Sequence, residues 1–468
     1  MEHDSVHFCA APLISKLAAA TVDEPRSSAA ARLPPLDTSR CATPSHGAKA
    51  GKAGLASLSS SDTLMSFGGE CHAAMEVRVD RSKVIGNGQY STVCLATLER
   101  GGTKAACAVK IPHANNLDAR ELGLIEAAAL AQLGPQPTAV VECFGLVNLR
   151  DADEHGVCPL RSWADAGAEA IAGGGGGEWG LVLEYCERGP CWQWMGENRA
   201  AMDAELFFLW ARQLTQALMA LRSAGLAHKD IKGHNMLLDC NGDVRLADFT
   251  AAQFSAQALA TAQETCPSFD PVSFPAYTDF SGTIPYSAPE TLAAASPTGN
   301  NADALHKADV YSLGVSLYTM FVSGREPYST VKSSVEQMLL SAKGAFWEWE
   351  ERHALASLQN HSTAPTSPLD APPGRCTQPP SPVGGPATLD HGLSRSLSLG
   401  PKPLRRRRTL KSRKPTPREF RSFLSGDPLP ANVEALLQSM VSPDPHLRPD
   451  AAEILRILDS IEPDIFEP

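Results

Sequence analysis

Residues 228–250 hold the side chains whose types and spacing best suit chemistry on a phosphate group. Asp230, Lys232 and Asn235 lie in one short polar stretch, and Asp248 follows a brief apolar run. One carboxylate can accept a proton, while a second carboxylate and an amide oxygen are ligands that magnesium prefers. Each of these residues alone is typical of a turn or a helix cap, so the prediction depends on their combination.

A glycine-rich turn earlier in the chain is suited to hold phosphate with its backbone. Residues 84–93 read Val-Ile-Gly-Asn-Gly-Gln-Tyr-Ser-Thr-Val, which predicts a strand, a turn and a second strand. Glycine lets the backbone approach a phosphate closely and aim N–H groups at it. Alone, the pattern also fits an ordinary hairpin. The apolar strand that follows ends in Lys110, which alone would be a solvated charge.

These segments resemble the motifs of the eukaryotic protein kinases, in the same order. Residues 228–235 are similar to the family's H-R-D-x-x-x-x-N, and residues 248–249 are similar to the start of its D-F-G. The strand of residues 107–110 is similar to the family's V-A-I-K. Two positions depart from the pattern, because Lys229 stands where the family usually has Arg and Thr250 stands where it usually has Gly.

The resemblance continues toward the C-terminus. Residues 282–290 are similar to the loop that binds the protein substrate and to its A-P-E ending. Asp309 begins a segment similar to the buried central helix, whose Asp anchors the catalytic loop. Arg448 matches the arginine that pairs with the A-P-E glutamate, here Glu290. Breaking such a buried pair costs about 3–5 kcal/mol, so we expect it to fix the architecture.

The resemblance implies a role for each matching side chain. Lys110, held by Glu126, would orient the phosphates of ATP. Asp230 would accept or orient the proton of the acceptor hydroxyl, and Lys232 would stabilise the phosphoryl group in transfer. The magnesium ligands would be Asn235 and Asp248. The nucleotide would contact residues from the glycine-rich turn to the strand after the catalytic loop: Ile85, Gly86, Gly88, Ser91, Val93, Ala108, Lys110, Glu184, Cys186 and Leu237.

Residues 118–133 have the apolar spacing of a helix, with Asp118 as the expected N-cap. Glu126 lies within the apolar face of this helix, where an unpaired carboxylate would be costly. The resemblance supplies Lys110 as its partner. Glu121 is the alternative partner for the lysine.

The resemblance implies an α+β, two-lobed fold. Residues 76–186 would form a small antiparallel β-sheet lobe with one helix, and residues 187–464 a larger, mainly α-helical lobe. Apolar patterns predict strands over 140–147 and 181–186, and a long helix over 203–222.

Three segments have a composition that predicts disorder. Residues 1–75 are a low-complexity leader, and residues 355–420 are rich in Pro and Ser before a strongly basic run. Residues 151–178 form an insert that contains five consecutive glycines. A flexible insert of this length is tolerated, because the entropy of loop closure grows slowly with loop length.

Composition narrows the class of protein. The formal net charge of −11 disfavours general nucleic-acid binding, and the 12 cysteines show no C-x-x-C pair. No apolar run reaches the length of a membrane span, and the acidic N-terminus is unlike a secretory signal. We therefore expect a reduced intracellular compartment, the cytoplasm, with the nucleus as the alternative.

The expected function is an ATP- and magnesium-dependent protein serine/threonine kinase in signalling. Lys232 and Thr283 both match the Ser/Thr branch of the family rather than the Tyr branch. The sequence of residues 231–235 is similar to the corresponding sequence in MAP-kinase-kinase-kinases and sterile-type kinases. The alternative, based on Thr250 and Lys229, is a pseudokinase scaffold that binds partners without phosphoryl transfer.

Two further expectations concern partners. In basophilic relatives a Glu precedes the catalytic-loop Asn and reads a substrate Arg, but here that position is His234, so we expect a weak preference for upstream Arg. The basic run within residues 402–418 could bind a docking partner, direct nuclear import or contact phosphoinositides; a merely solvated linker is the alternative.

The regulatory expectation concerns the activation loop. The position that is usually phosphorylated falls on Asp279, with Thr278 beside it as a supplementary site. A carboxylate at Asp279 facing Lys229 would be a standing, partial substitute for the phosphate. Lys229 lacks the two-pronged fork of Arg, which suits a phosphate. The alternative is that Asp279 is a solvated loop residue.

Overall fold

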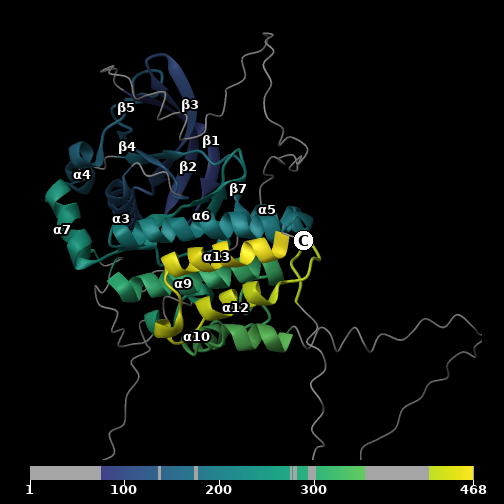
Figure 1. Ribbon diagram of the computed structural model, residues 1–468. Coiled ribbons are helices and arrows are strands. Elements are labelled where there is room, and N and C mark those ends of the chain that lie inside the picture. The colour runs from purple at the N-terminus through teal and green to yellow at the C-terminus, as the bar shows by residue number, and fades with distance from the viewer. Residues whose placement is uncertain are drawn as a thin grey trace, which may run out of the picture. The chain divides into compact units, whose positions relative to one another are not determined.

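The glycine-rich turn and the strand that ends in Lys110 are neighbours in one six-stranded antiparallel sheet (Figure 1). The strands lie in the order β4-β6-β3-β2-β1-β5. Their bounds are β1 Glu76–Asn87, β2 Ser91–Arg100, β3 Thr103–Pro112, β4 Cys143–Asn148, β5 Val157–Pro159 and β6 Trp179–Glu184. Val93 of β2 is opposite Lys110, and Cys107 of β3 is opposite Glu184. The register therefore brings the turn, the lysine and the end of β6 together.

The structure is a computed structural model that describes most of the expected kinase region. The described residues are 75–134, 139–172, 178–274, 277, 282–292, 302–353 and 421–466. The expected leader up to residue 74, the expected insert 355–420, and the regulatory candidates Thr278 and Asp279 lie outside the described residues.

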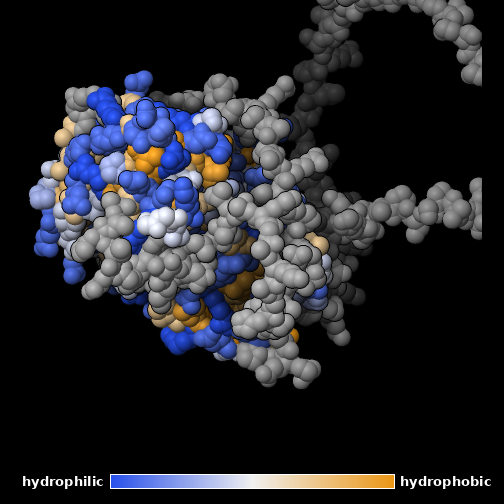
Figure 2. Space-filling view, turned by 90° about the horizontal axis from the view of Figure 1, so that it is seen from above, coloured by the Kyte–Doolittle hydropathy of each residue, from blue (hydrophilic) through white to orange (hydrophobic). Residues whose placement is uncertain are grey.

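The two faces of the sheet contribute to different hydrophobic clusters, because successive side chains of a strand point to opposite faces. Ala108 and Leu183 belong to the main cluster, together with α3 (Leu117–Leu133). Val109 and Val182 belong to a smaller cluster on the other face. Figure 2 shows mostly hydrophilic residues on the face seen from above, with apolar residues gathered in a few patches.

Helix α3 begins two residues earlier than the sequence predicts. Its N-cap is Asn116, whose side-chain oxygen accepts a hydrogen bond from the N–H of Ala119 at 3.1 Å. Asp118 lies instead in the first turn, where its charge suits the positive end of the helix dipole. The predicted N-cap at Asp118 is therefore wrong by two residues, while the predicted end at Leu133 is confirmed.

The insert of residues 151–178 was expected to be disordered, and for its described residues this expectation is wrong. It contains β5, which pairs with β1, and α4 (Trp163–Ala172), which packs against α3. Trp163, Ala166 and Ala170 are buried in the main cluster. Ser162 and Asp165 form a capping arrangement, since the N–H of Asp165 donates to Ser162 Oγ at 3.2 Å. This S-x-x-D signal in the sequence was outweighed by the neighbouring glycines.

The expected single helix beside the sheet is thus joined by a second one, α4. The other expected strand bounds shift slightly. The predicted strand 140–147 is observed as β4, while Val140 makes only an isolated bridge to Leu246. The predicted strand 181–186 is observed as β6, which begins at Trp179 and ends at Glu184.

The larger part of the described chain is mainly helical, as the family resemblance implies. Its helices are α5 Cys191–Glu197, α6 Ala204–Ser223, α7 Ala256–Thr265, α9 Ala302–Tyr318, α10 Ser334–Ala342, α12 Ala431–Met440 and α13 Ala451–Phe466. The predicted long helix is α6, capped by Asp203, whose side chain accepts from the N–H of Leu206 at 3.0 Å. Among the described residues, no helix is long and apolar enough to cross a membrane.

Short strands hold the catalytic segment against these helices. β7 (Gly189–Pro190), β9 (Met236–Leu238) and β10 (Val244–Leu246) form a three-stranded sheet, while β8 (Leu226–Ala227) pairs with β11 (Gln253–Phe254). Between Thr250 and Gly282 the chain forms the helix α7, whose N-cap is Ser255. The sequence pattern did not indicate α7, because the buried face of this helix consists of alanines such as Ala258 and Ala262 rather than of large apolar residues.

Candidate active site

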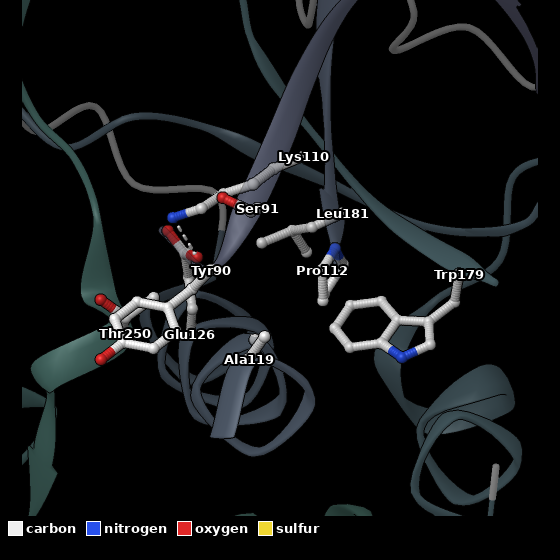
Figure 3. Close-up of a pocket in the computed structure, with 10 residues that line it drawn as sticks. Tyr90, Ser91, Lys110, Pro112, Ala119, Glu126, Trp179, Leu181 and Thr250 are labelled. Atoms are coloured by element: carbon white, nitrogen blue, oxygen red, sulfur yellow. Dashed lines mark ion pairs between the residues drawn. The ribbon is translucent and has the colours of Figure 1, made fainter. Parts of the chain in front are cut away.

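Lys110 lies at the centre of a cluster of three charges, which Figure 3 shows in part. Its Nζ is 2.6 Å from Glu126 Oε2 and 2.9 Å from Asp248 Oδ1. Burial opposes the charge of the lysine, but the two carboxylates outweigh it and raise the lysine's pKa above its usual value. The predicted partner Glu126 is thus confirmed over the alternative Glu121 as the carboxylate that pairs with Lys110.

The two carboxylates of this cluster have opposite environments. Burial raises the pKa of Glu126, whose side chain is 1% exposed, although Lys110 acts in the other direction. Burial also disfavours the charge of Asp248, but Lys110 and the Thr250 hydroxyl hold the pKa of Asp248 well below its usual range. Asp248 is therefore a charged carboxylate at neutral pH, while Glu126 depends on the lysine for its charge.

Thr250 occupies the position where the kinase family usually has glycine. Its hydroxyl donates to Asp248 Oδ1 at 2.8 Å, and it lies in the short 3₁₀ turn Phe249–Ala251. The left-handed backbone is found two residues earlier, at Asp248, where φ is 66°. Position 250 therefore needs no glycine in this conformation. Tyr90, from the glycine-rich turn, and Thr250 line the same pocket (Figure 3).

A second polar cluster surrounds Asp230. Its Oδ1 accepts from the hydroxyl of Thr283 at 2.7 Å. Its Oδ2 accepts from Lys232 Nζ at 2.9 Å and from Asn235 Nδ2 at 2.8 Å. Lys232 also donates to Thr283 at 2.7 Å. The structure therefore brings together four residues that the sequence analysis singled out, from two segments about fifty positions apart in the chain.

The backbone of this catalytic loop is held by buried Asp309 from α9. Its carboxylate accepts from the N–H of His228 at 2.7 Å and from the N–H of Lys229 at 2.9 Å. Both contacts are formed although Lys229 has a left-handed backbone, with φ at 63°. The expected anchoring by Asp309 is confirmed. Burial raises the pKa of Asp309, although these two N–H groups and nearby positive charge oppose the rise.

Glycine is needed where the substrate loop meets the catalytic loop. Gly282 has φ of 121°, and a Cβ there would lie 2.5 Å from the carbonyl oxygen of Lys229. Any larger residue would push the two loops apart, so Gly282 sets the approach of Thr283 to Asp230. The side chain of Lys229 is half-buried, and burial lowers its pKa although Asp309 opposes this. Its proposed partner Asp279 lies outside the described residues.

The predicted pair of Arg448 and Glu290 is formed and is bidentate. Arg448 Nη1 and Nη2 donate to the two carboxylate oxygens at 2.6 and 2.9 Å. Arg448 is 2% exposed and also donates through Nε to the carbonyl of Ser442 at 2.7 Å. Because a buried arginine with these partners leaves little polar surface unsatisfied, the pair fixes the end of the substrate loop.

The expected nucleotide contacts lie around the sheet end. Gly86 is opposite Val93 in the β1–β2 register, and Ile85 is 45% exposed although it is apolar. Ala108 is buried on β3, and Leu237 is half-buried on β9. The N–H of Glu184 donates to the carbonyl of Glu142 at 2.8 Å, which fixes the chain at the end of β6. Other residues of the expected set are Gly88, Ser91 and Cys186, and their contacts with a nucleotide remain a prediction.

The donor set fits the magnesium ion that the kinase family implies. Asp248 offers a charged carboxylate, and Asn235 offers an amide oxygen, since its nitrogen already donates to the backbone oxygen of Asp230 at 2.9 Å. Hard oxygen donors of this kind are those magnesium prefers. Asn235 and Asp248 would therefore hold the ion, as the sequence analysis expects.

Two features of the site were not predicted from the sequence. One is the hydroxyl of Thr250 on Asp248, which its side-chain type could have suggested. The other is Glu326, whose Oε2 accepts from the hydroxyl of Tyr286 at 2.7 Å and whose Oε1 is 3.7 Å from His234 Nε2. Glu326 has no local motif, because only the fold brings it beside the catalytic loop.

Comparison with known proteins agrees with this geometry. The sequence matches the protein kinase domain family over residues 79–457. The serine/threonine-protein kinase kin-29 of Caenorhabditis elegans is 28% identical over 171 residues, covering 36% of this chain and 18% of that protein. An Aurora kinase of Patiria pectinifera is 30% identical over 151 residues, covering 32% of this chain and 31% of that protein.

The serine/threonine-protein kinase SSK22 of Saccharomyces cerevisiae is 29% identical over 165 residues, covering 35% of this chain and 12% of that protein. The chain thus spans less than a third of the length of each of these curated relatives. The family match, in contrast, extends over most of the chain and includes both polar clusters. This chain therefore belongs to the protein kinase family.

Proposed function

We propose that this protein is a serine/threonine kinase that transfers the γ-phosphate of Mg-ATP to hydroxyl groups of proteins. The observation that carries the proposal is the contact of one carboxylate, Asp230, with both a hydroxyl and an ammonium. The Thr283 hydroxyl at 2.7 Å supports an alcohol as a ligand of this carboxylate, and Lys232 lies 2.9 Å from it with a positive charge. These are the two groups that phosphoryl transfer to an alcohol requires.

Each side chain has a defined task in this proposal. Lys110, fixed by Glu126, binds phosphate oxygens, and Lys232 offsets negative charge on the group in transfer. Asp230 orients the acceptor hydroxyl and takes its proton. Magnesium, when bound, would neutralise phosphate charge. Most of the rate enhancement then comes from positioning and electrostatics rather than from covalent chemistry.

One observation favours the pseudokinase alternative. Asp248 Oδ1 already accepts from both Lys110 and Thr250, at 2.9 and 2.8 Å. A cation would compete with these donors for the same oxygen, so Thr250 weakens the metal site relative to a glycine. A scaffold that binds partners without phosphoryl transfer is the function that this competition would favour.

The partners and the compartment belong to the same proposal. We propose ATP and proteins with Ser or Thr acceptors as ligands, no specific nucleic acid, and a docking partner for the basic run within residues 402–418. The proposed compartment is the cytoplasm, with the nucleus as the alternative. Deleting residues 355–420 and following the location of the protein in cells would distinguish the cytoplasm from the nucleus.

The test is transfer of labelled phosphate from ATP to a generic acceptor such as casein or myelin basic protein, with the full chain. We expect transfer by the native protein and its loss in Lys110→Met, which removes the ion pair and the phosphate contact. Lys104→Met is the matched control on the same strand, because Lys104 is 55% exposed and pairs only with Glu99 among the ion pairs of the described residues. Absence of transfer by the native protein, with nucleotide or partner binding retained, would instead support the scaffold.

A further inference from the structure

Glu326 places an exposed carboxylate beside the catalytic loop. Its side chain is 39% exposed, and its two oxygens face different neighbours. Oε2 accepts from the hydroxyl of Tyr286, three residues after Thr283, at 2.7 Å. Oε1 is 3.7 Å from His234, the residue before Asn235. Glu326 therefore borders both segments that meet at Asp230, where the acceptor hydroxyl must lie.

The loop that carries Glu326 is held firmly on both sides. It follows the π-helical turn Thr319–Ser323, which ends at Gly324 with a left-handed backbone. Arg325 pairs with the buried carboxylate of Glu350 at 3.0 Å. Tyr328, two residues after Glu326, is 1% exposed. Because the loop is already ordered, binding a charged ligand at Glu326 loses little conformational entropy.

Among the described residues, the polar contacts of the Glu326 carboxylate are with the rings of Tyr286 and His234. Tyr286 is a neutral donor, since burial and the nearby carboxylates raise its pKa well above its usual value. The side chain of His234, whose Nε2 lies 3.7 Å from Glu326 Oε1, is itself 45% exposed. The ring of His234 is also stacked on Trp192.

The lysine of the catalytic loop is paired with other groups. Lys232 is engaged by Asp230 and Thr283, with 2.9 and 2.7 Å contacts. The surface beside the acceptor position thus carries an exposed carboxylate whose neighbours, within the described part of the chain, are a phenol and an imidazole. This is an arrangement that attracts a cation from outside the chain.

We propose that Glu326 is a specificity-determining residue that binds an arginine or lysine of the protein substrate, close to the acceptor Ser or Thr. This inference rests on the proposed kinase function. It reverses the expectation of weak Arg preference, which was drawn from His234 alone. A basic side chain of the substrate that lies next to His234 would contact the carboxylate of Glu326, which is far from His234 in the sequence.

The test uses the full chain and a set of serine peptides. Each peptide carries one Arg at a single position within three residues of the serine, and its twin carries Gln there. For the best position, we expect kcat/KM to be about fivefold higher with Arg than with Gln, the size of an exposed ion pair. The preference should shrink with added salt, because salt screens exposed charges.

Variants then assign the preference to one carboxylate. Glu326→Gln keeps an acceptor for the Tyr286 hydroxyl but removes the charge, so the Arg preference should fall below about twofold. Glu348→Gln, at an exposed position of the neighbouring segment, should leave it unchanged. Glu326→Arg should reverse it and favour peptides with Glu in place of Arg.

The outcomes are separable from those of the proposed function. An Arg preference that survives Glu326→Gln, or its absence from the native protein, overturns the inference while phosphate transfer continues. If no peptide or generic acceptor is phosphorylated, the proposed function fails, and binding of the same labelled peptides decides the inference by fluorescence anisotropy. Tighter binding of the Arg peptide by the native protein than by Glu326→Gln would then uphold it, and equal binding would overturn it.

Discussion

Helix α3 has two kinds of neighbour, and they differ in how the sequence encodes them. On its polar side, Glu126 contacts Lys110 and accepts from the N–H of Phe249 at 3.2 Å. Elsewhere on its surface, α3 packs against α4 of the insert and against α7 (Figure 1). The first set of contacts consists of charged groups in recognisable motifs. The second consists of alanines and aromatic rings with no motif at all.

The apolar neighbours of α3 also connect it to the catalytic loop. The ring of Trp163, at the start of α4, lies edge-on to Phe269, with ring centres 5.7 Å apart. Phe269 in turn contacts Phe254 on β11, again with 5.7 Å between ring centres. β11 pairs with β8, which directly precedes His228. The insert therefore helps to hold both α3 and the loop that carries Asp230.

This comparison predicts that the polar side of the site determines turnover, while the apolar side determines stability. The largest expected effect is that of Asp230→Asn, which should lower kcat by about 10²–10⁴-fold, the usual contribution of a general acid–base group. The melting temperature should change little, because Asn can still accept from Thr283. Steady-state kinetics and thermal unfolding check this, with the exposed Asp270→Asn as the control. Full activity in Asp230→Asn would contradict the assigned role.

The apolar side should behave in the opposite way. Trp163 is 6% exposed, so Trp163→Ala should lower the free energy of unfolding by about 3–5 kcal/mol. Trp163→Phe should cost clearly less, because the ring contact with Phe269 remains and Trp163 Nε1 has no hydrogen-bond partner among the described residues. Denaturant unfolding measures both variants. If Trp163→Ala unfolds like the native protein, α4 does not support α3 and the comparison fails.

The same comparison explains how much the sequence could predict. Asp230, Lys232, Asn235 and Asp248 were found because phosphate chemistry needs fixed residue types at fixed spacings. The order of α4 was missed, because a segment rich in alanine and next to five glycines gains its order only by packing on α3. Glu326 was missed for a related reason, since its place beside His234 depends on the tertiary fold. Short sequence motifs therefore reveal the catalytic residues. The packing that stabilises α3 and the proposed substrate contact of Glu326 depend on residues that are distant in the sequence.

A pH scan sharpens the comparison, because it detects a buried group that belongs to neither side of α3. His306 in α9 is 3% exposed, and its Nε2 accepts from the N–H of Ala451 at 3.2 Å. Burial, with Arg222 and Lys307, lowers the pKa of His306 to about 4 although Asp450 and Asp303 oppose the fall. In the unfolded chain His306 therefore binds a proton near pH 6.5, whereas in the folded chain it does so only near pH 4.

The consequence has a definite sign. His306 contributes stability that is fully present above pH 6.5 and is lost as the pH falls from about 6.5 to about 4. The loss should reach about 3 kcal/mol, at 1.4 kcal/mol per pKa unit. His306→Gln keeps an acceptor for Ala451 and should flatten the curve over this range. An unchanged slope in this variant, measured by denaturant unfolding at each pH, would show that other groups cause the loss.

The smallest expected effect returns to the polar side of α3 and concerns Thr250. Its hydroxyl donates to Asp248 Oδ1, the oxygen that also receives Lys110. Thr250→Val keeps the branched shape but removes the donor, so Asp248 should bind a cation more readily. We expect the magnesium concentration for half-maximal activity to fall by about two- to fivefold, the equivalent of one modest hydrogen bond. Thr250→Ser keeps the hydroxyl and should leave the requirement near the native value. If Val and Ser behave alike in the magnesium titration, the hydroxyl does not compete with the cation, and the argument that favours a scaffold over an enzyme loses its structural basis.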